Sequence, residues 1–431
     1  MTSSLALLGR LEACTIRNVT HREPSGALDF QAARQIVIDT LYRLAALPPV
    51  EQVPLESAHG RVLAEPCRAD RDYPSVARSL RDGFAIQAAD SPGEFIVTGE
   101  LRAGEAGGGP SLLPGQALEI MTGAPIPDGA DAVFMVEHVT RIHVSRTDGG
   151  SRISVDRQAD RGQWINPRGT EAQAGSELIP ARTRLDAAGI AALAMAGAAQ
   201  VKVFSRPRVA ILATGDELVE VGQNVLPHQI RNSNSYALAA LVSHSGALPT
   251  ILPLVRDEPG PLRSALERGI SDFDLMLVTG GVSAGKYDLV KPVLVQIGAH
   301  FLFERVRVQP GQPTAFGIAL GRPVFGLPGN PGSTIVTYLL FADAAIRLLA
   351  GERTPILPIL EATFEAPFRH KLGLTRFLPA RLSTDGKSLH HIPWQGSSDV
   401  PALARANAFL IADHDRESWQ IGDRIRVIAK P

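Results

Sequence analysis

Three short segments that are rich in glycine and acidic residues have the composition of a site for a phosphate and a divalent cation. They are ATGDELVEVG, with Asp216 and Glu217 at its turn, VTGGVSAGKYD, which ends at Asp288, and GLPGNPGST. Glycine lets the backbone approach a ligand closely, and a helix that follows such a turn points free N–H groups at an anion. Because the three acids would repel a bare phosphate, we expect Mg²⁺ to bridge them to it.

Each segment also has a simpler structural interpretation. A Gly-Gly pair after a strand is commonly a plain turn, and Asp288 would serve equally well as the N-cap of a helix. Three such loops at consecutive strand ends favour the phosphate and metal site over these alternatives.

The elements that position these loops are predicted by the pattern of residues 207–351. Four continuous apolar runs, RVAIL, LPTILPLV, FDLMLVT and PVFGLP, are each followed by a helical pattern. Such alternation indicates a parallel sheet that is covered by helices on both faces. In open sheets of this kind, ligands bind beyond the carboxyl ends of the strands, and that is where the three loops fall.

The rest of the chain predicts four further regions. Residues 1–26 look irregular. A helix is expected over residues 29–47, and a second one, in DAAGIAALAMAGA, is expected to pack beside it. Short strand-like runs between Pro and Gly turns, with RTDGGSR as a hairpin tip, indicate an inserted β-rich domain. The predicted domains are a discontinuous linking domain at 27–67 and 160–205, the β-rich domain at 68–159, the α/β domain at 206–351 and a C-terminal β domain at 352–431.

The composition limits the classes of function. Of the 431 residues, 45% are hydrophobic and 20% charged, as in a soluble globular protein. A net charge of −1 argues against a nucleic-acid binder that works through a bulk basic field. The sequence has no apolar run of the roughly 20 residues that a membrane helix needs, and no basic start of a signal peptide. Cys14 and Cys67 lack metal-like spacing, so a cytoplasmic protein without a membrane anchor is expected.

The three loops, taken in order, resemble those of the molybdopterin molybdenumtransferase family, the MoeA and gephyrin E-domain type of protein. The matching motifs are TGDEL (214–218), TGGVSAGKYD (279–288) and LPGNP (327–331). In addition, SLRDGFA (79–85) resembles the family's Ser-x-x-Asp-Gly-Tyr-Ala, and IMTGAPIPDGADAV (120–133) is close to its Met-Thr-Gly-Ala-Pro-x-Pro segment. Two further segments match family motifs in position, PGQP (310–313) and PRGTEAQAG (167–175). The resemblance therefore covers about residues 29–431.

The resemblance implies a multidomain α/β plus β protein. Its parts would be a doubly wound, mostly parallel sheet domain of the molybdopterin-binding type, an inserted β-rich domain, an extended linking domain and a small C-terminal β-barrel-like domain. The family forms an elongated homodimer whose pocket lies between the α/β domain of one subunit and the β-rich domain of the other. Molybdenum from molybdate enters the dithiolene of adenylylated molybdopterin, AMP is released and Mg²⁺ assists. The expected partners are the molybdopterin adenylyltransferase and molybdoenzyme-specific chaperones.

The resemblance also assigns site residues by position. Asp82 matches the acid that the family needs for metal insertion, and Thr122 matches a site threonine. Glu217 and Asp288 match acids near the Mg²⁺ and the pterin, and we expect them to act in catalysis and as metal ligands. The expected substrate-binding residues are Thr214, Gly215, Asp216, Gly280, Gly281, Ser283, Lys286, Lys291, Gln309, Gly311, Gln312, Pro328, Gly329 and Asn330.

Several of these residues have simpler interpretations. Asp-Gly is a common turn pair, which would explain Asp82 without chemistry. Thr122 fits a strand end in a Pro-rich turn. Ser283 fits a helix cap, and Lys291 fits a solvated helix lysine.

The chain departs from the family pattern at the site itself. Arg78 stands within the family's Phe-Asp-Asn-Ser segment, Asn232 replaces an acid, and Gln309 and Gln312 replace the lysines of Lys-Pro-Gly-Lys. Lys286 replaces an acid, and we hypothesise that it restores the positive charge lost at the two glutamines. Two other functions stay open. A molybdopterin adenylyltransferase stays open because its family shares loops of the SGG and PGNP type, and a non-catalytic molybdenum-cofactor carrier or scaffold stays open because of these departures.

Overall fold

The computed structural model describes residues 27–44, 46–105, 111–142, 151–281, 288–355 and 357–431. The irregular segment predicted for residues 1–26 and most of the RTDGGSR hairpin tip lie outside these ranges. The chain forms two compact units, each described by itself below. The first unit comprises Met1–Val50 and Phe204–Pro431, and the second unit comprises Glu51–Val203.

A six-stranded sheet organises the first unit, in the order β16-β13-β17-β21-β20-β18. The first four strands in this order are parallel, while β20 and β18 run antiparallel at one edge. The sequence patterns predict the parallel strands and miss the antiparallel pair. The strands are β13 (Arg208–Ala213), β16 (Leu248–Ile251), β17 (Leu275–Thr279), β18 (His300–Phe303), β20 (Ala315–Ala319) and β21 (Arg322–Leu327).

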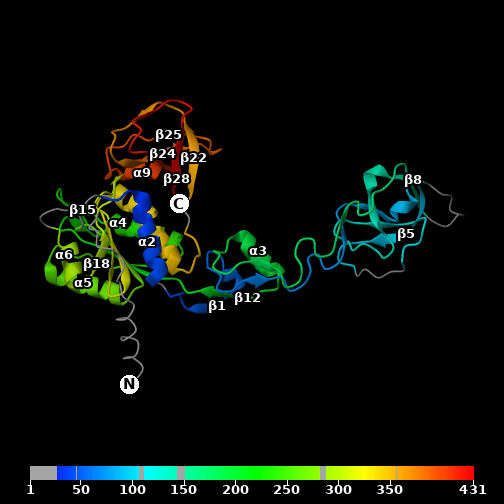
Figure 1. Cartoon of the computed structure of the whole chain (residues 1–431), viewed down its shortest axis with the longest axis horizontal. Helices are drawn as coiled ribbons and strands as arrows, with labels where there is room; N and C mark the ends of the chain where they lie inside the picture. The colour runs from blue at the N-terminus through cyan, green and yellow to red at the C-terminus, as the bar shows by residue number, and fades with distance from the viewer. Residues whose placement is uncertain (1–26, 45, 106–110, 143–150, 282–287, 356) are drawn as a thin grey trace, which may run out of the picture. The chain divides into compact units, whose positions relative to one another are not determined.

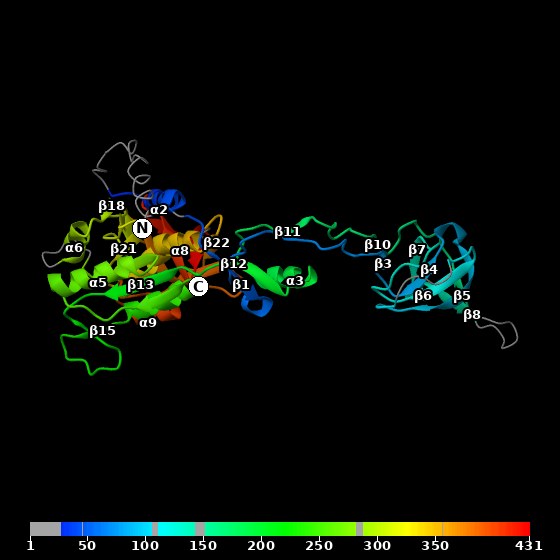
Figure 2. The same cartoon turned by 90° about the horizontal axis from the view of Figure 1, so that it is seen from below.

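Helices cover both faces of this sheet, since successive strand residues point to opposite sides. In β13, Val209 and Ile211 enter one core with α2, α4, α7 and α8, while Ala210 and Leu212 enter another with α5 and α6. Figure 2 shows α5 and α6 beside the sheet strands β13 and β21. The helices are α2 (Phe30–Leu44), α4 (Asn234–His244), α5 (Pro259–Ser271), α6 (Val290–Gln296), α7 (Pro331–Thr337) and α8 (Asp343–Leu349).

A π-helical turn, Tyr338–Ala342, joins α7 to α8. The combined helix, Pro331–Leu349, has 19 residues and is long and apolar enough to cross a membrane by length and composition. However, 83% of its most apolar window is buried inside the molecule. The helix therefore serves as the core helix of the α/β domain.

The N-terminal helix α2 belongs to the first unit. Its buried face joins the core that holds α8, and the ring of Phe30 meets Phe377 edge to face with centroids 5.3 Å apart. The guanidinium of Arg34 donates to the carbonyl oxygens of Leu340 and Pro355 at 2.9 and 2.7 Å. The helix predicted in DAAGIAALAMAGA lies in the second unit instead. Because α2 and this helix belong to different units, the expectation that they pack side by side stays a prediction.

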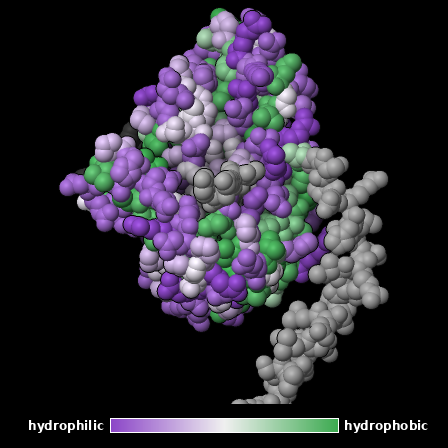
Figure 3. Space-filling view, turned by 90° about the vertical axis from the view of Figure 1, so that its left-hand side faces the viewer, coloured by the Kyte–Doolittle hydropathy of each residue, from purple (hydrophilic) through white to green (hydrophobic). Residues whose placement is uncertain are grey.

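The C-terminal segment of the first unit forms a closed five-stranded barrel, because β24 pairs with both β25 and β26. Figure 1 shows these orange and red strands grouped beside α9. The face of the first unit in Figure 3 is mostly polar, with apolar residues scattered over it. The barrel strands are β22 (Ile359–Phe364), β24 (Thr375–Leu382), β25 (Ser388–His391), β26 (Ala408–Ala412) and β28 (Arg424–Ala429). The smaller elements are β14 (Leu218–Val219), β15 (Ile230–Arg231), β19 (Val308–Gln309), β23 (Phe368–Arg369), β27 (Ser418–Trp419) and α9 (Val400–Arg405).

The second unit contains a six-stranded sheet in the order β7-β4-β6-β5-β9-β8. Phe84, Phe95 and Phe134 are fully buried in its core. A separate small core unites residues from both chain segments that flank this sheet, including Leu63, Leu193 and Val203. The sheet strands are β4 (Gly83–Ile86), β5 (Gly93–Leu101), β6 (Gln116–Ile120), β7 (Ala132–Met135), β8 (Thr140–Ile142) and β9 (Arg152–Val155). The flanking elements are β1 (Val50–Pro54), β2 (Cys67–Arg68), β3 (Arg78–Ser79), β10 (Ile165–Asn166), β11 (Glu177–Ile179), α3 (Ala187–Met195) and β12 (Gln200–Phe204).

Candidate functional site

A cavity of about 450 Å³ lies at the carboxyl ends of β13, β17 and β21. The three glycine-rich loops meet there, as their positions at strand ends predict. Nine of the expected site residues line the cavity: Thr214, Gly215, Glu217, Gly280, Gly281, Asp288, Pro328, Gly329 and Asn330.

The backbones of the first two loops lie so close together that no side chain fits between them. The amide of Thr214 donates to the carbonyl of Thr279 at 3.1 Å. Gly280 has a φ of +91°, and a Cβ built on it would lie 2.2 Å from the carbonyl oxygen of Thr214. Only glycine fits at this position, for reasons of both conformation and space.

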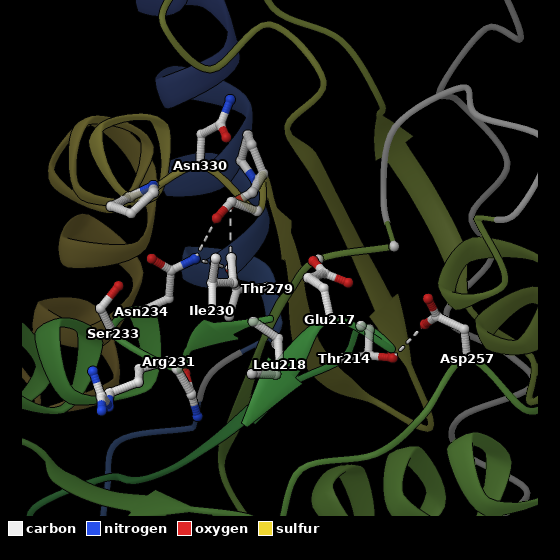
Figure 4. A pocket seen from close by; sticks show the side chains of 18 of the residues that line it. Thr214, Glu217, Leu218, Ile230, Arg231, Ser233, Asn234, Asp257, Thr279 and Asn330 are labelled. Carbon is white, nitrogen blue, oxygen red and sulfur yellow. Dashed lines mark hydrogen bonds between the residues drawn. The ribbon is translucent and has the colours of Figure 1, made fainter. Parts of the chain in front are cut away.

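Asn234, the first residue of α4, ties the loops together. Its Nδ2 donates to the hydroxyl of Thr279 at 3.0 Å and to the carbonyl of Gly329 at 2.6 Å. The Thr279 hydroxyl in turn donates to the carbonyl of Pro328 at 3.2 Å. In Figure 4, dashed lines run from the nitrogen of Asn234 toward Thr279 and toward the loop that carries Asn330. One carboxamide therefore links the ends of β17 and β21 to the start of α4.

Carboxylates gather on the other side of the cavity. Figure 4 shows Glu217 and Asp257 on the side away from Asn234. The hydroxyl of Thr214 donates to Asp257 at 2.6 Å, and Asp257 and Asp288 both line the cavity. Sequence analysis missed Asp257, although it follows the strand run LPTILPLV and so satisfies the strand-end rule.

The chemistry of these oxygen donors fits Mg²⁺. Protein sites for this ion supply one or two carboxylates and leave the remaining positions to water and substrate phosphates. Glu217 and Asp288 provide such a pair in the lining. Within the described ranges, no three His, Cys, Asp or Glu side chains cluster closely enough to form a complete metal cage.

The lining also contains polar and apolar residues that sequence analysis did not select. Arg231 is the one cationic side chain among the described residues of the lining, and it donates to the carbonyl of Gln223 at 3.2 Å. Leu218 and Ile230 add an apolar wall. The local signal for these residues is weak, because the long loop between β14 and β15 brings them to the site.

Asn232, one of the departures from the family pattern, is 2% exposed and caps α4. Its Oδ1 accepts from the amide of Ser235 at 3.1 Å, and its Nδ2 donates to the hydroxyl of Ser235 at 3.0 Å. A neutral carboxamide completes both bonds without adding a fourth acid to Glu217, Asp257 and Asp288. The substitution therefore makes the lining less negative while keeping the helix start in place.

Five expected residues of the first unit lie outside the lining. Asp216 accepts from the amide of Asp257 at 3.4 Å. Lys291 pairs with Glu304 at 2.9 Å. The segment with Gln309, Gly311 and Gln312 reaches the cavity only through Pro313. Ser283 and Lys286, together with the hypothesis of charge replacement by Lys286, fall outside the described residues. Roles in substrate binding for these residues stay predictions.

Asp82 and Thr122 meet each other in the second unit. Both the amide and the hydroxyl of Thr122 donate to Asp82 Oδ1, at 2.6 and 2.9 Å. These bonds from the Thr122 amide and hydroxyl hold the pKa of the exposed Asp82 carboxyl below its ordinary value. A carboxylate with a lowered pKa is a weaker base, so the geometry favours an electrostatic role over proton abstraction.

The turn that carries Asp82 is fixed by its neighbour Gly83. A Cβ built on Gly83 would lie 1.8 Å from the carbonyl oxygen of Phe134 on the adjacent strand β7. The carbonyl of Asp82 also accepts from the amide of Val136 at 3.1 Å. The Asp-Gly pair therefore begins a tightly paired strand, so it is more than a surface turn.

Comparisons with known protein families cover most of the chain. Residues 28–197 match the MoeA N-terminal region (domain I and II), residues 210–348 a probable molybdopterin binding domain, and residues 361–430 the MoeA C-terminal region (domain IV).

Curated relatives and solved structures give the same result. The molybdopterin molybdenumtransferase of Bacillus subtilis is 36% identical over 88% of this chain and 89% of its own length. That of Nostoc sp. is 37% identical over 73% of both chains. The crystal structure of a molybdopterin biosynthesis MoeA protein from Pyrococcus horikoshii aligns with a TM-score of 0.77 at 27% identity, over 94% of this chain and all of that one.

Proposed function

The chain belongs to the molybdopterin molybdenumtransferase family, and from this premise we propose that it inserts molybdenum from molybdate into adenylylated molybdopterin and releases AMP. The reaction is a step of molybdenum cofactor biosynthesis, and the pterin nucleotide and molybdate are its substrates. One observation carries the proposal, namely that three strand-end loops form a single cavity whose lining combines glycine-rich backbone with Glu217 and Asp288.

Each part of the lining suits one part of such a substrate. The loops that contain Gly280 and Gly329 present backbone to the phosphoryl group without side chains in between. Glu217 and Asp288 would hold Mg²⁺, which supplies positive charge at the phosphoryl oxygens when it is bound. Ile230 and Leu218 offer apolar contact to a planar ring.

In this proposal, Asp82 acts at the molybdenum atom. Its carboxylate is ionised at neutral pH, as an exposed carboxyl is, and the two hydrogen bonds that Thr122 donates fix its position and lower its pKa further. A fixed negative charge stabilises positive character at molybdenum as the two dithiolene sulfurs bond to it and an oxo ligand leaves as water with the two thiol protons. Thr122 is then a positioning residue, since its hydroxyl is engaged by Asp82.

The other two functions make different predictions. The named relatives favour the insertion enzyme over a molybdopterin adenylyltransferase. The test is to mix the purified protein with adenylylated molybdopterin, Mg²⁺ and molybdate and to follow AMP. Release of AMP that depends on molybdate supports the proposal. Tight binding without AMP release supports a carrier or scaffold, and consumption of ATP with unmodified molybdopterin supports the adenylyltransferase.

We also propose a homodimer, as the family resemblance implies, with Asp82 of one subunit serving the cavity of its partner. Two inactive variants, Asp82→Ala and Glu217→Ala, would then complement each other in mixed dimers. Random mixing leaves one intact site in half of the dimers, so about a quarter of wild-type turnover should return. A mixture as inactive as its parents would show that both residues act within one subunit.

The remaining expectations concern the cell. A reducing compartment such as the cytoplasm suits Cys67, which is buried and free among the described residues. The molybdopterin adenylyltransferase, which makes the substrate, and molybdoenzyme-specific chaperones, which accept the product, are the proposed protein partners. Copurification of either from cell extract in a substrate-dependent manner would support this.

A further inference from the structure

Two exposed arginines, Arg78 and Arg81, lie beside Asp82 in the second unit. Neither Arg78 nor Arg81 forms an ion pair within the described part of the chain. In contrast, seven arginines of the same unit lie within 4.0 Å of a carboxylate: Arg68, Arg71, Arg102, Arg141, Arg152, Arg161 and Arg168. Arg157 of the same unit also forms no described ion pair and lies over the Phe134 ring. Arg78 and Arg81 are distinguished by their place beside the one acid of this unit that the proposed reaction requires.

Arg81 is held in place by an aromatic ring. Its guanidinium lies 4.9 Å from the centroid of the Trp164 ring, at a distance typical of a cation–π contact. This stacking uses the face of the guanidinium and leaves N–H groups at its edge for a ligand. One of these groups, Nη1, makes a long contact of 3.4 Å with the carbonyl of Leu80.

Trp164 adopts a conformation that is unfavourable for a bulky residue. Its φ is +54°, in the left-handed region that glycine and asparagine normally occupy. Its carbonyl accepts from the amide of Leu80 at 2.9 Å, which fixes the ring next to the turn that carries Asp82. The residue as a whole is 38% exposed, so burial in a core does not explain why tryptophan occupies this position.

Arg78 lies on the other side of the same turn. Its guanidinium makes a long contact of 3.5 Å with the carbonyl of Gly123, the residue after Thr122. Backbone hydrogen bonds between Ser79 and the segment Gly123–Ala124 hold the two sides together at 2.8 and 2.9 Å. Arg78, Arg81, Asp82 and Thr122 thus form one connected surface, with two positive charges around one negative charge.

We propose that Arg81, stacked on Trp164, and Arg78 form a subsite for a tetrahedral oxyanion beside Asp82. The inference rests on the proposed function, because molybdate and the phosphoryl end of the nucleotide are both tetrahedral oxyanions. An ionised Asp82 alone would repel either of them. The two guanidinium groups change the sum of formal charges from −1 to +1, and their edges present the N–H donors that oxyanions bind.

The test compares Arg81→Gln with wild type under saturating nucleotide. We expect the KM for molybdate to rise roughly tenfold while kcat changes less than about twofold, and the effect to shrink at high salt. A weaker Kd for the pterin nucleotide with an unchanged KM for molybdate would assign the subsite to the phosphoryl group instead. The control is Arg152→Gln, which removes the same charge from β9, three strands away from β4 in the sheet. Unchanged KM and Kd in Arg81→Gln would overturn the proposal.

A second variant separates this role from a structural one. Trp164→Gly removes the ring, and relief of the positive φ offsets part of the lost packing, so the Tm should change by only a few degrees. The KM or Kd that Arg81→Gln affects should nevertheless worsen in this variant. A Tm loss with unchanged substrate parameters would show that Trp164 serves the fold only and would count against the subsite.

Direct binding tests the subsite without turnover. Sodium molybdate alone and AMP alone are titrated into the protein while the fluorescence of Trp164 is followed against a Trp164→Phe background. Quenching that Arg81→Gln weakens supports the subsite even if the wild-type protein releases no AMP, an outcome that would refute only the proposed function. Absence of any Trp164-dependent response to both anions would refute the subsite.

Discussion

The cavity of the first unit and the Asp82 surface of the second unit differ in how they are built. The cavity is formed by loops that glycine packs closely together, with three acids and a single arginine among its described lining residues. The Asp82 surface is exposed, and its two arginines outnumber its one carboxylate. The first region relies on backbone placement, and the second on side-chain charge.

This difference teaches how the two regions should respond to change. Close backbone packing tolerates few substitutions, and a loosened loop lowers affinity for everything that the loop holds. An exposed charged surface tolerates substitution structurally, but each charge changes one interaction. Variants of the cavity should therefore affect nucleotide binding, whereas variants of the Asp82 surface should affect molybdate and turnover.

The largest effect is expected from Asp82→Ala. Loss of a preorganised charge at the reacting centre should lower kcat by about 100-fold to 1,000-fold. The Kd for the pterin nucleotide should stay at the wild-type value, because in the proposed function the strand-end loops of the first unit hold the nucleotide. Single-turnover kinetics and equilibrium binding measure the two quantities. The control is Asp128→Ala, which removes an exposed acid of the same unit. If the Kd weakens in parallel with kcat, the assignment of Asp82 to turnover and of the cavity to nucleotide binding is wrong.

A smaller effect is expected from Asn234→Ala. Removing Nδ2 breaks the bonds to Thr279 and Gly329, so the nucleotide Kd should weaken by about tenfold, the equivalent of one net hydrogen bond. Asn234→Asp should bind still more weakly, since a carboxylate oxygen would face the carbonyl of Gly329. Asn407→Ala removes an asparagine that bridges barrel strands and is the control. Equal nucleotide affinities in all of these variants would show that the loops keep their shape without the hydrogen bonds of Asn234.

The smallest effect concerns pH. Because the pKa of folded Asp82 lies below its ordinary value of about 3.9, the carboxylate stays ionised above that value and is neutralised only as pH falls through the lower folded pKa. Its contributions to turnover and stability should thus be constant at neutral pH and lost in acid. Thr122→Val removes the hydroxyl donor but keeps the amide, so the pKa should rise part of the way back. Carbon NMR of the Asp82 carboxyl measures this pKa. A pKa that falls in Thr122→Val would show that the Thr122 hydroxyl does not lower it.

Much of the first unit can be predicted from sequence because its signals are local. Apolar runs such as FDLMLVT form β17, and the rule of strand ends places Glu217, Gly280 and Gly329 around one cavity. The antiparallel strands β18 and β20 are missed because their apolar runs are short and lack intervening helices. Asp257 was within reach of the same rule and was overlooked.

Other features cannot be read from local patterns at all. Arg81 and Trp164 are 83 positions apart, and only the pairing of β3 with β10 brings them together. The positive φ of Trp164 has no sequence signal, since tryptophan rarely adopts it. Asp82 itself was found through its resemblance to a family motif, because Asp-Gly by composition indicates only a turn.

The packing of α2 has a consequence for the synthesis of the protein. The ring of Phe30 rests against Phe377, and the buried stripe of α2 contacts core residues contributed by the π-helical turn and the barrel. The ribosome makes α2 first and these partners last. The apolar face of the nascent helix therefore stays exposed to solvent until nearly the whole polypeptide has emerged. Such a face is a natural binding segment for cotranslational chaperones.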